Sequence, residues 1–160
     1  MGLKTDLLEQ SFAAMARRGD ELVDIFYGNL FKDCPEVEPL FAHLDMARQK
    51  RMLLASLQLI VGNLRCPAIL EPMLRRLGAR HVQYGAREEH YAAVGAALLG
   101  ALAEVAGEDW SDELAEAWGE AYEEISRHML AGAPAAQRFF QSTSASDAKA
   151  RCRAWVPSRP

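Results

Sequence analysis

Residues 75–91 read RRLGARHVQYGAREEHY, and one residue in this stretch breaks the pattern around it. His81 follows Leu70, Leu74 and Leu77 at the steps of three and four that place side chains on one face of a helix. The imidazole therefore stands where another leucine is expected. Burying a nitrogen heterocycle among leucines costs free energy unless both ring nitrogens find partners. The fold and the function depend on what those two partners are.

The composition is that of one soluble globular domain, since 160 residues fit a single domain and half of them are hydrophobic. A net charge of −4 gives no basic footprint for nucleic acid or for an acidic membrane surface. No run of 18 apolar residues is present, and the N-terminus MGLKTDLLEQSF lacks the apolar region of a signal peptide. We therefore expect a cytoplasmic protein without a nucleic-acid or membrane partner.

The chain is helix-like up to about Gly132, because Ala, Leu, Glu and Arg are frequent and β-branched residues are few. Asp6 and Glu9 resemble a capping box at the start of the first helix, and Gly19 is expected to end it. Ser111, followed by two acidic residues, is a good start for the last helix. The predicted fold class is all-α, with helices over about residues 5–18, 20–31, 46–64, 67–84, 88–106 and 111–130.

The domain is predicted to cover residues 1–132, and residues 133–160 are predicted to form a flexible C-terminal tail. This last stretch turns to Ala, Ser, Pro and Gln. Phe139, Phe140 and Trp155 are unexpectedly apolar for a tail. The sequence leaves open whether they dock on the domain or on a partner.

Three polar residues interrupt apolar helix faces: Tyr27, Gln49 and His81. Each has an ordinary explanation. A lone histidine is usually a core residue bonded to a backbone carbonyl, a tyrosine among apolar residues usually reaches water with its hydroxyl, and a glutamine often marks the border of a stripe. His90 and His128 are expected on the surface. Taken one at a time, these residues indicate no function.

Taken together, the three residues suggest one shared, flat, apolar cofactor. Histidine is the common axial ligand of haem iron, and its other nitrogen then donates to a carbonyl such as that of Leu77, four residues earlier. Tyr27 and Gln49 are predicted to donate hydrogen bonds to a diatomic ligand on the other side of the iron. A dry pocket strengthens such donors, and Leu53 and Phe41 are predicted to form its apolar walls.

Three stretches carry a resemblance to the globins of the bacterial flavohaemoglobin and single-domain haemoglobin family. IFYGNLFKDCPEVEPLF (25–41) resembles the family's second helix and Pro-rich bend, and residues 75–91 resemble its proximal helix with the HxxxG and His-Tyr pairs. DELAEAWGEAYEEI (112–125) resembles the last helix with its WGxAY pattern. The family's separations also recur, with 81 − 49 = 32 residues between Gln49 and His81 and 91 − 81 = 10 before Tyr91.

The resemblance covers roughly Leu7 to Leu130. It implies the globin fold, a 3-over-3 helical sandwich around haem b (iron protoporphyrin IX). It makes His81 the proximal iron ligand and Tyr91 its neighbour in the haem pocket. The ligands that it implies are dioxygen, nitric oxide and carbon monoxide.

The leading functional hypothesis is reversible dioxygen binding, including transport and the detoxification of nitric oxide. One alternative is a nitric oxide dioxygenase, in which Tyr27 and Gln49 would be the catalytic residues. This enzyme would need a separate flavoprotein reductase, because no Gly-rich dinucleotide turn occurs in these 160 residues. The other alternative is a haem-based gas sensor that signals through a partner. The same pocket serves all three hypotheses.

The sequence departs from the family at one place near the haem. The family often has a glutamate late in the last helix that pairs with the proximal histidine and tyrosine. Counting from Trp118 places this position near Ala133, which is not acidic, and Glu123 and Glu124 come too early. An imidazole without that anionic partner donates less electron density to iron, which makes O–O bond cleavage less favourable.

Overall fold

The computed structural model of the protein describes residues 2–133, and within them it contains helices and no strand. The all-α expectation is therefore confirmed. The tail predicted for residues 133–160 lies outside the described residues, apart from Ala133. The α-helices are α1 (Thr5–Met15), α2 (Gly19–Asp33), α3 (Met46–Gly62), α4 (Pro67–Gln83), α5 (His90–Ala106) and α6 (Asp112–Gly132), with 3-10 helices at Ala16–Arg18, Pro35–Phe41 and Gly107–Asp109.

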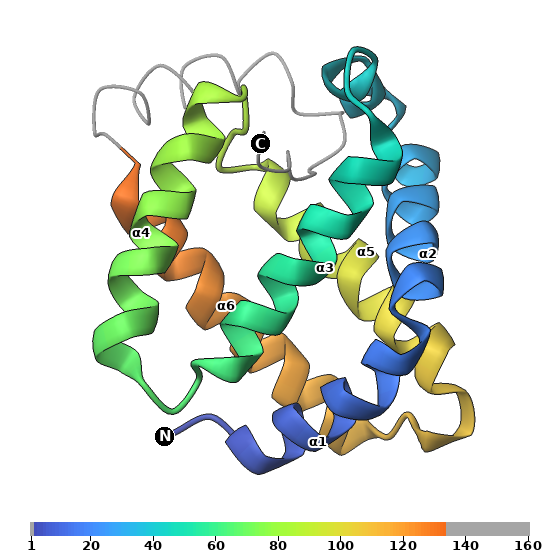
Figure 1. Ribbon diagram of the computed structural model, residues 1–160, viewed down its shortest axis with the longest axis vertical. Helices are drawn as coiled ribbons and strands as arrows, with labels where there is room; N and C mark the ends of the chain where they lie inside the picture. The colour runs from blue at the N-terminus through green and yellow to red at the C-terminus, as the bar shows by residue number, and fades with distance from the viewer. Residues whose placement is uncertain (1, 134–160) are drawn as a thin grey trace.

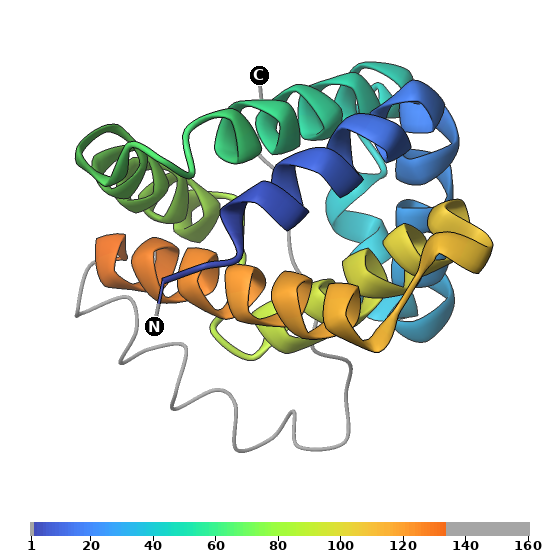
Figure 2. The same cartoon turned by 90° about the horizontal axis from the view of Figure 1, so that it is seen from below.

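The helices form two layers that cross each other. Figure 2 shows α1 and α3 on one side of the molecule and α5 and α6 on the other. Figure 1 shows α3 crossing in front of the layer behind it, with α4 at one edge and α2 at the opposite edge. The most extensive helix pairs are α4 with α6 and α2 with α5. These pairs hold α4, which carries His81 and Leu77, and α2, which carries Tyr27, on opposite sides of the core.

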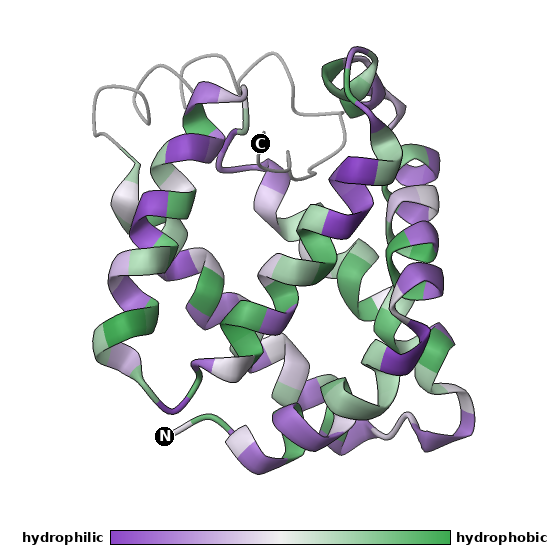
Figure 3. Cartoon of the chain, in the orientation of Figure 1, coloured by the Kyte–Doolittle hydropathy of each residue, from purple (hydrophilic) through white to green (hydrophobic). Residues whose placement is uncertain are grey.

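The long helices other than α5 are amphipathic, and green hydrophobic and purple hydrophilic segments alternate along their ribbons in Figure 3. The apolar faces join into one continuous core. Helix α5 is the most apolar, and by length and hydropathy the stretch His90–Asp109 is a candidate membrane span. The core helix of a soluble protein meets the same criterion, and half of this stretch is buried inside the protein. Its burial between α2 and α6 explains its composition.

Two of the predicted helix starts are confirmed. Pro67 occupies the first position of α4, where the missing N–H costs nothing. Ser111 precedes α6, and its Oγ accepts a hydrogen bond from the backbone N–H of Leu114 at 3.2 Å. Both starts depend on residues close in sequence, which is why the sequence reveals them.

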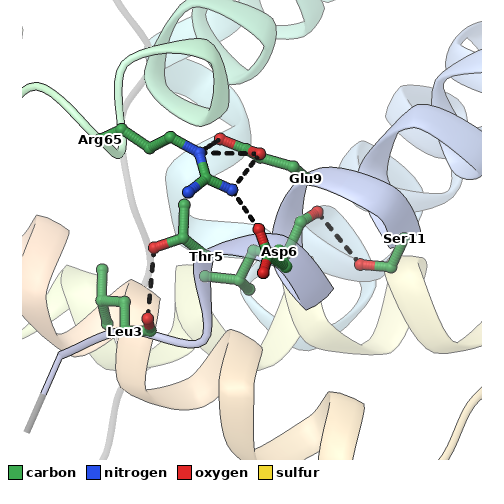
Figure 4. A network of polar contacts seen from close by, with 7 residues as sticks. Leu3, Thr5, Asp6, Glu9, Ser11 and Arg65 are labelled. Carbon is green, nitrogen blue, oxygen red and sulfur yellow. Dashed lines mark hydrogen bonds and ion pairs between the residues drawn. The ribbon is translucent and has the colours of Figure 1, made fainter.

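The capping box expected at Asp6 and Glu9 is wrong. Lys4 precedes α1, and no side chain caps this helix end. Both carboxylates instead pair with Arg65, in the loop between α3 and α4 (Figure 4). The Nε and Nη2 atoms of Arg65 lie 3.0 and 2.9 Å from the carboxylate oxygens of Glu9. An ion pair between segments 56 residues apart is invisible in the local pattern.

The expected end of the first helix at Gly19 is also wrong. Gly19 begins α2 with helical backbone angles, φ −60° and ψ −39°. The chain leaves α1 earlier, at Met15, and turns through the 3-10 helix Ala16–Arg18. Glycine commonly ends a helix because it adopts positive φ readily, but here it takes the ordinary helical angles instead.

Candidate functional site

His81 lies on the buried face of α4 and is fully enclosed, with 0% of its surface exposed. Its Nδ1 donates a hydrogen bond to the carbonyl oxygen of Leu77 at 2.7 Å, as the sequence predicts. A carbonyl only accepts, so the proton of the neutral ring lies on Nδ1 and the lone pair on Nε2. Burial, opposed by the bond to Leu77, lowers the pKa of His81 to about 4. At neutral pH the side chain is thus an uncharged imidazole with a lone pair on Nε2, the form that binds metals.

The backbone directly after His81 is fixed by a tight helix end. The N–H of Ala86 donates to the carbonyl of His81 at 3.0 Å, and the N–H of Gly85 donates to the carbonyl of Val82 at 3.1 Å. These two bonds form a Schellman motif, which requires a left-handed residue, and Gly85 has φ 93°. The main chain of His81 is therefore held on both sides, by its own helix and by the cap.

Tyr27 and Gln49 meet across the contact of α2 with α3. Both are buried, with 2% and 3% of their surfaces exposed. The Nε2 of Gln49 donates to the hydroxyl oxygen of Tyr27 at 3.3 Å. A hydroxyl has one proton to donate and two lone pairs to accept with, so Tyr27 keeps its proton for another acceptor. Burial raises the pKa of Tyr27 well above its ordinary value, which keeps the hydroxyl protonated.

The first turn of α3 holds Gln49 in place. The Asp45 side chain caps the helix by accepting from the backbone N–H groups of Ala47 and Arg48, at 3.0 and 3.3 Å. The carbonyl of Asp45 accepts from the N–H of Gln49 at 2.9 Å. An Asp at this point, followed by helix-forming residues, is a local signal that sequence reasoning missed.

Aromatic rings surround the hydroxyl-bearing ring of Tyr27. The ring centroids of Phe26, Phe31 and Phe41 lie 5.0, 5.8 and 5.7 Å from that of Tyr27. Phe41 also meets Phe31 edge to face at 5.1 Å. Edge-to-face packing fixes ring positions, so the tyrosine hydroxyl has little freedom to move. Phe41 thus forms an apolar wall beside Tyr27, as predicted.

An apolar cavity lies among α3, α4, α5 and α6, and His81, Gln49 and Tyr27 themselves are not among its lining residues. Leu53, one turn after Gln49, lines it from α3, and Leu77, one turn before His81, lines it from α4. The cavity therefore joins the helix that carries Gln49 to the helix that carries His81. Its lining consists of Phe26, Leu53, Ser56, Leu57, Ile60, Leu77, Tyr91, Val94, Leu98, Tyr122, Ile125 and Met129.

Tyr91 belongs to the far wall of this cavity, on α5. Burial raises its pKa to about 12, and its carbonyl oxygen accepts from the hydroxyl of Tyr122 at 2.5 Å. Sequence reasoning quoted Tyr122 only as part of a motif and missed it as a lining residue. Its position four residues after Trp118 on one helix face was the available signal.

His90 and His128, expected on the surface, are both buried, with 7% and 8% of their surfaces exposed. The Nδ1 of His90 accepts from the backbone N–H of Arg87 at 3.1 Å, and His128 Nε2 lies 3.0 Å from Glu124. Neither lines the cavity. Within residues 2–133, no three His, Cys, Asp or Glu side chains gather as a metal site.

The comparisons with known proteins agree with this architecture. A family model described as globin matches residues 24–129. A flavohemoprotein of Bordetella parapertussis is 33% identical over 126 residues, which are 78% of this chain and 31% of that protein. A flavohemoprotein of Xylella fastidiosa is 34% identical over 118 residues, 72% of this chain and 30% of that protein. This chain thus spans about a third of the length of these curated relatives.

Among solved structures, a bacterial globin of Campylobacter jejuni superposes with a TM-score of 0.70 at 25% identity, covering 80% of this chain and 92% of that one. A Pseudomonas aeruginosa protein described as structurally highly homologous to a human hemoglobin gives 0.69 at 27% identity, covering 80% and 96%. These neighbours confirm the globin fold. With the helices, the cavity and the family match in agreement, the chain belongs to the globin family.

Proposed function

We propose that the chain binds haem b through His81 and that this haem would bind dioxygen reversibly. Its globin and flavohemoprotein relatives imply a haem-binding family. The residues present fit that group. His81 offers a neutral imidazole lone pair, and the cavity that Leu77 lines, one turn before His81, is apolar. His81 would hold the iron of such a haem, and the macrocycle would supply the equatorial ligands.

The hydrogen bond between Gln49 and Tyr27 is the observation that carries the proposal for dioxygen. A haem in this site supplies an iron atom that binds diatomic gases reversibly. Gln49 occupies one lone pair of the Tyr27 oxygen, so the tyrosine proton is available to the gas. In an apolar pocket such a donor favours the ligand that draws more negative charge. Dioxygen is therefore retained in preference to carbon monoxide.

The proximal partner of His81 supports ligand binding over bond cleavage. Nδ1 donates to a neutral carbonyl, that of Leu77. Ala133 stands where the family often has a carboxylate, and it is buried. A histidine bonded to a carbonyl is less electron-donating than one bonded to a carboxylate. This arrangement favours reversible binding of dioxygen over cleavage of an O–O bond.

Nitric oxide dioxygenation is the second candidate, because the relatives are flavohemoproteins of which this chain matches about a third. Tyr27 and Gln49 would hold dioxygen in place while nitric oxide enters. Electrons would come from a flavoprotein reductase, and the rate at which a cytosolic reductase restores the ferrous state decides the matter. If no cytosolic reductase restored the ferrous state within a useful time, dioxygenation over multiple turnovers would be untenable. A gas sensor would instead show ligand-dependent contact with a partner.

The first test is the visible absorption spectrum of the purified protein reconstituted with haemin. We expect a Soret band that changes on reduction with dithionite and sharpens and shifts with carbon monoxide. The reduced spectrum also shows whether an internal sixth ligand must be displaced. Absence of a Soret band at one haemin per chain would reject the proposal and leave His81 a core histidine.

A further inference from the structure

Helices α4 and α6 touch through their backbones at two glycines. A Cβ built on Gly78 of α4 would lie 1.8 Å from the carbonyl oxygen of Met129 on α6. A Cβ built on Gly132 of α6 would lie 1.9 Å from the carbonyl oxygen of Arg75 on α4. Real Cβ contacts are essentially never below 3.0 Å, and both obstacles are backbone atoms that no rotamer change can move away.

The contact is reciprocal, and each helix contributes one glycine and one carbonyl. On α4 the carbonyl of Arg75 precedes Gly78 by three residues, and on α6 that of Met129 precedes Gly132 by three. Because these two contacts lie one turn apart, they prevent α4 from sliding along α6 and from rotating against it. Glycine in a helix interior is destabilising relative to alanine. Gly78 offsets this cost because it allows the backbones of α4 and α6 to approach closely.

The position of Gly78 connects this contact to the haem site. Gly78 directly follows Leu77, whose carbonyl accepts the Nδ1 proton of His81, and it precedes His81 by three residues. Met129 lines the cavity from the other side of the contact. The closest approach of the two helices therefore lies in the same turn that orients the imidazole.

We propose that Gly78 and Gly132 are positioning residues that set where the Nε2 of His81 lies relative to the cavity that Leu77 lines from the same helix. This proposal rests on His81 being the iron ligand. A methyl group at either position forces α4 away from α6 and carries the imidazole and the Leu77 carbonyl with it. The cavity walls on α5 and α6 do not follow, so the geometry between His81 and a haem held by those walls changes.

The experiment compares Gly78→Ala and Gly132→Ala with Gly119→Ala as the matched control. Gly119 is also a glycine within α6, but a Cβ there meets nothing within 4 Å. The main readout is the iron–histidine stretching band in the resonance Raman spectrum of the ferrous, ligand-free protein. We expect this band to shift or split in both Gly78→Ala and Gly132→Ala and to stay unchanged in the control. Haemin transfer to an acceptor protein should speed up about tenfold or more in these two variants.

The spectroscopic band separates positioning from general stability. If Gly78→Ala and Gly132→Ala lower the melting temperature but keep the wild-type band, the two glycines serve packing alone and the proposal is overturned. Gly132 is the last residue of α6, where a small shift is easier to absorb, so Gly132→Ala decides if Gly78→Ala fails to fold. A wild-type protein whose reduced absorption spectrum is five-coordinate and that still lacks the band would instead reject His81 as the ligand.

Discussion

The two sides of the haem site are built by different means. On the α4 side, backbone groups position His81. The Leu77 carbonyl accepts a hydrogen bond from the imidazole ring, and the end of the helix that follows is capped at Gly85. On the side of α2 and α3, side chains place one another. Gln49 donates to Tyr27, and phenylalanine rings surround the tyrosine.

This difference bears on how each side responds to substitution. Backbone contacts leave no rotamer to adjust, so a change in or near α4 has to move a helix. A side-chain pair such as Tyr27 and Gln49 can lose one member while the helices stay in place. We therefore expect mutations on the α4 side to affect haem binding itself, and mutations on the opposite side to adjust the kinetics of the gas.

The largest effect is expected for His81→Ala. The variant loses the proposed iron ligand, and the haem content after purification should fall far below one per chain. The ratio of Soret to protein absorbance measures this. Added imidazole should restore a histidine-like spectrum, since it can occupy the vacated volume. Full haem content with an unchanged spectrum in the variant would show that another residue binds the iron.

Acid should weaken the apoprotein through its buried neutral histidines, of which His81 lies on α4 and His90 on α5. Burial lowers the pKa of His81 to about 4, below the value of about 6.5 in the unfolded chain. Between these values the unfolded chain binds more protons, so the free energy of unfolding falls as the pH is lowered from about 6.5 to about 4. The loss is at most about 3 kcal/mol for His81, from the conversion of 1.36 kcal/mol per pKa unit.

Urea unfolding of the apoprotein at pH 7, 6, 5 and 4 measures this slope. His81→Gln should flatten it, and Tyr27→Phe should not, because the pKa of Tyr27 is raised and its hydroxyl stays protonated throughout. His90 adds to the slope, since burial first and Arg87 next lower its pKa to about 4. Equal slopes in the wild type and His81→Gln would contradict the buried neutral imidazole.

Tyr27→Phe should leave haem content unchanged and speed dioxygen release. A hydrogen bond to a charged or strongly polarised group contributes about 1.5–3 kcal/mol, which corresponds to roughly a 10- to 100-fold faster release. Stopped-flow or flash-photolysis kinetics measure the rate. Carbon monoxide release is the internal control and should change much less. If both gases respond equally, the tyrosine acts by its bulk and not by its proton.

Gln49→Leu should have the smallest effect on the site. Gln49 reaches the gas partly through Tyr27, whose oxygen accepts its amide proton at 3.3 Å. Losing a neutral hydrogen bond costs about 0.5–1.5 kcal/mol, so dioxygen release should speed up about 2- to 10-fold. Gln58→Leu, an exposed glutamine on the same helix, is the matched control. An effect as large as that of Tyr27→Phe would make Gln49 a direct donor of equal weight.

The sequence is informative where the physical cause is local. Steps of three and four residues placed His81, Leu77 and Leu53 on buried faces, and Pro67 marked the start of a helix. These signals lie within one or two helical turns. The bond from His81 to Leu77 follows from the same spacing, and so it was predictable.

Long-range contacts account for the errors. Asp6 and Glu9 have the spacing of a capping box, but Arg65 competes for both from a distant loop. The close approach at Gly78 depends on where α6 crosses α4, and no pattern within either helix specifies the crossing point.

The two proposed donors to the gas, Tyr27 and Gln49, should stay in position for different lengths of time, because Gln49 depends on the helix cap at Asp45. Gln49 lies in the first turn of α3, whereas Tyr27 lies in the middle of α2. Helix ends open locally far more often than helix centres, and the opening of this turn withdraws the glutamine while the core stays folded. Amide hydrogen exchange should therefore be faster at residues 46–49 than around Tyr27. The site then has an open state, in which only Tyr27 can donate to the gas, and a closed state, in which Gln49 is also in place. The Asp45 cap sets the balance between these two states.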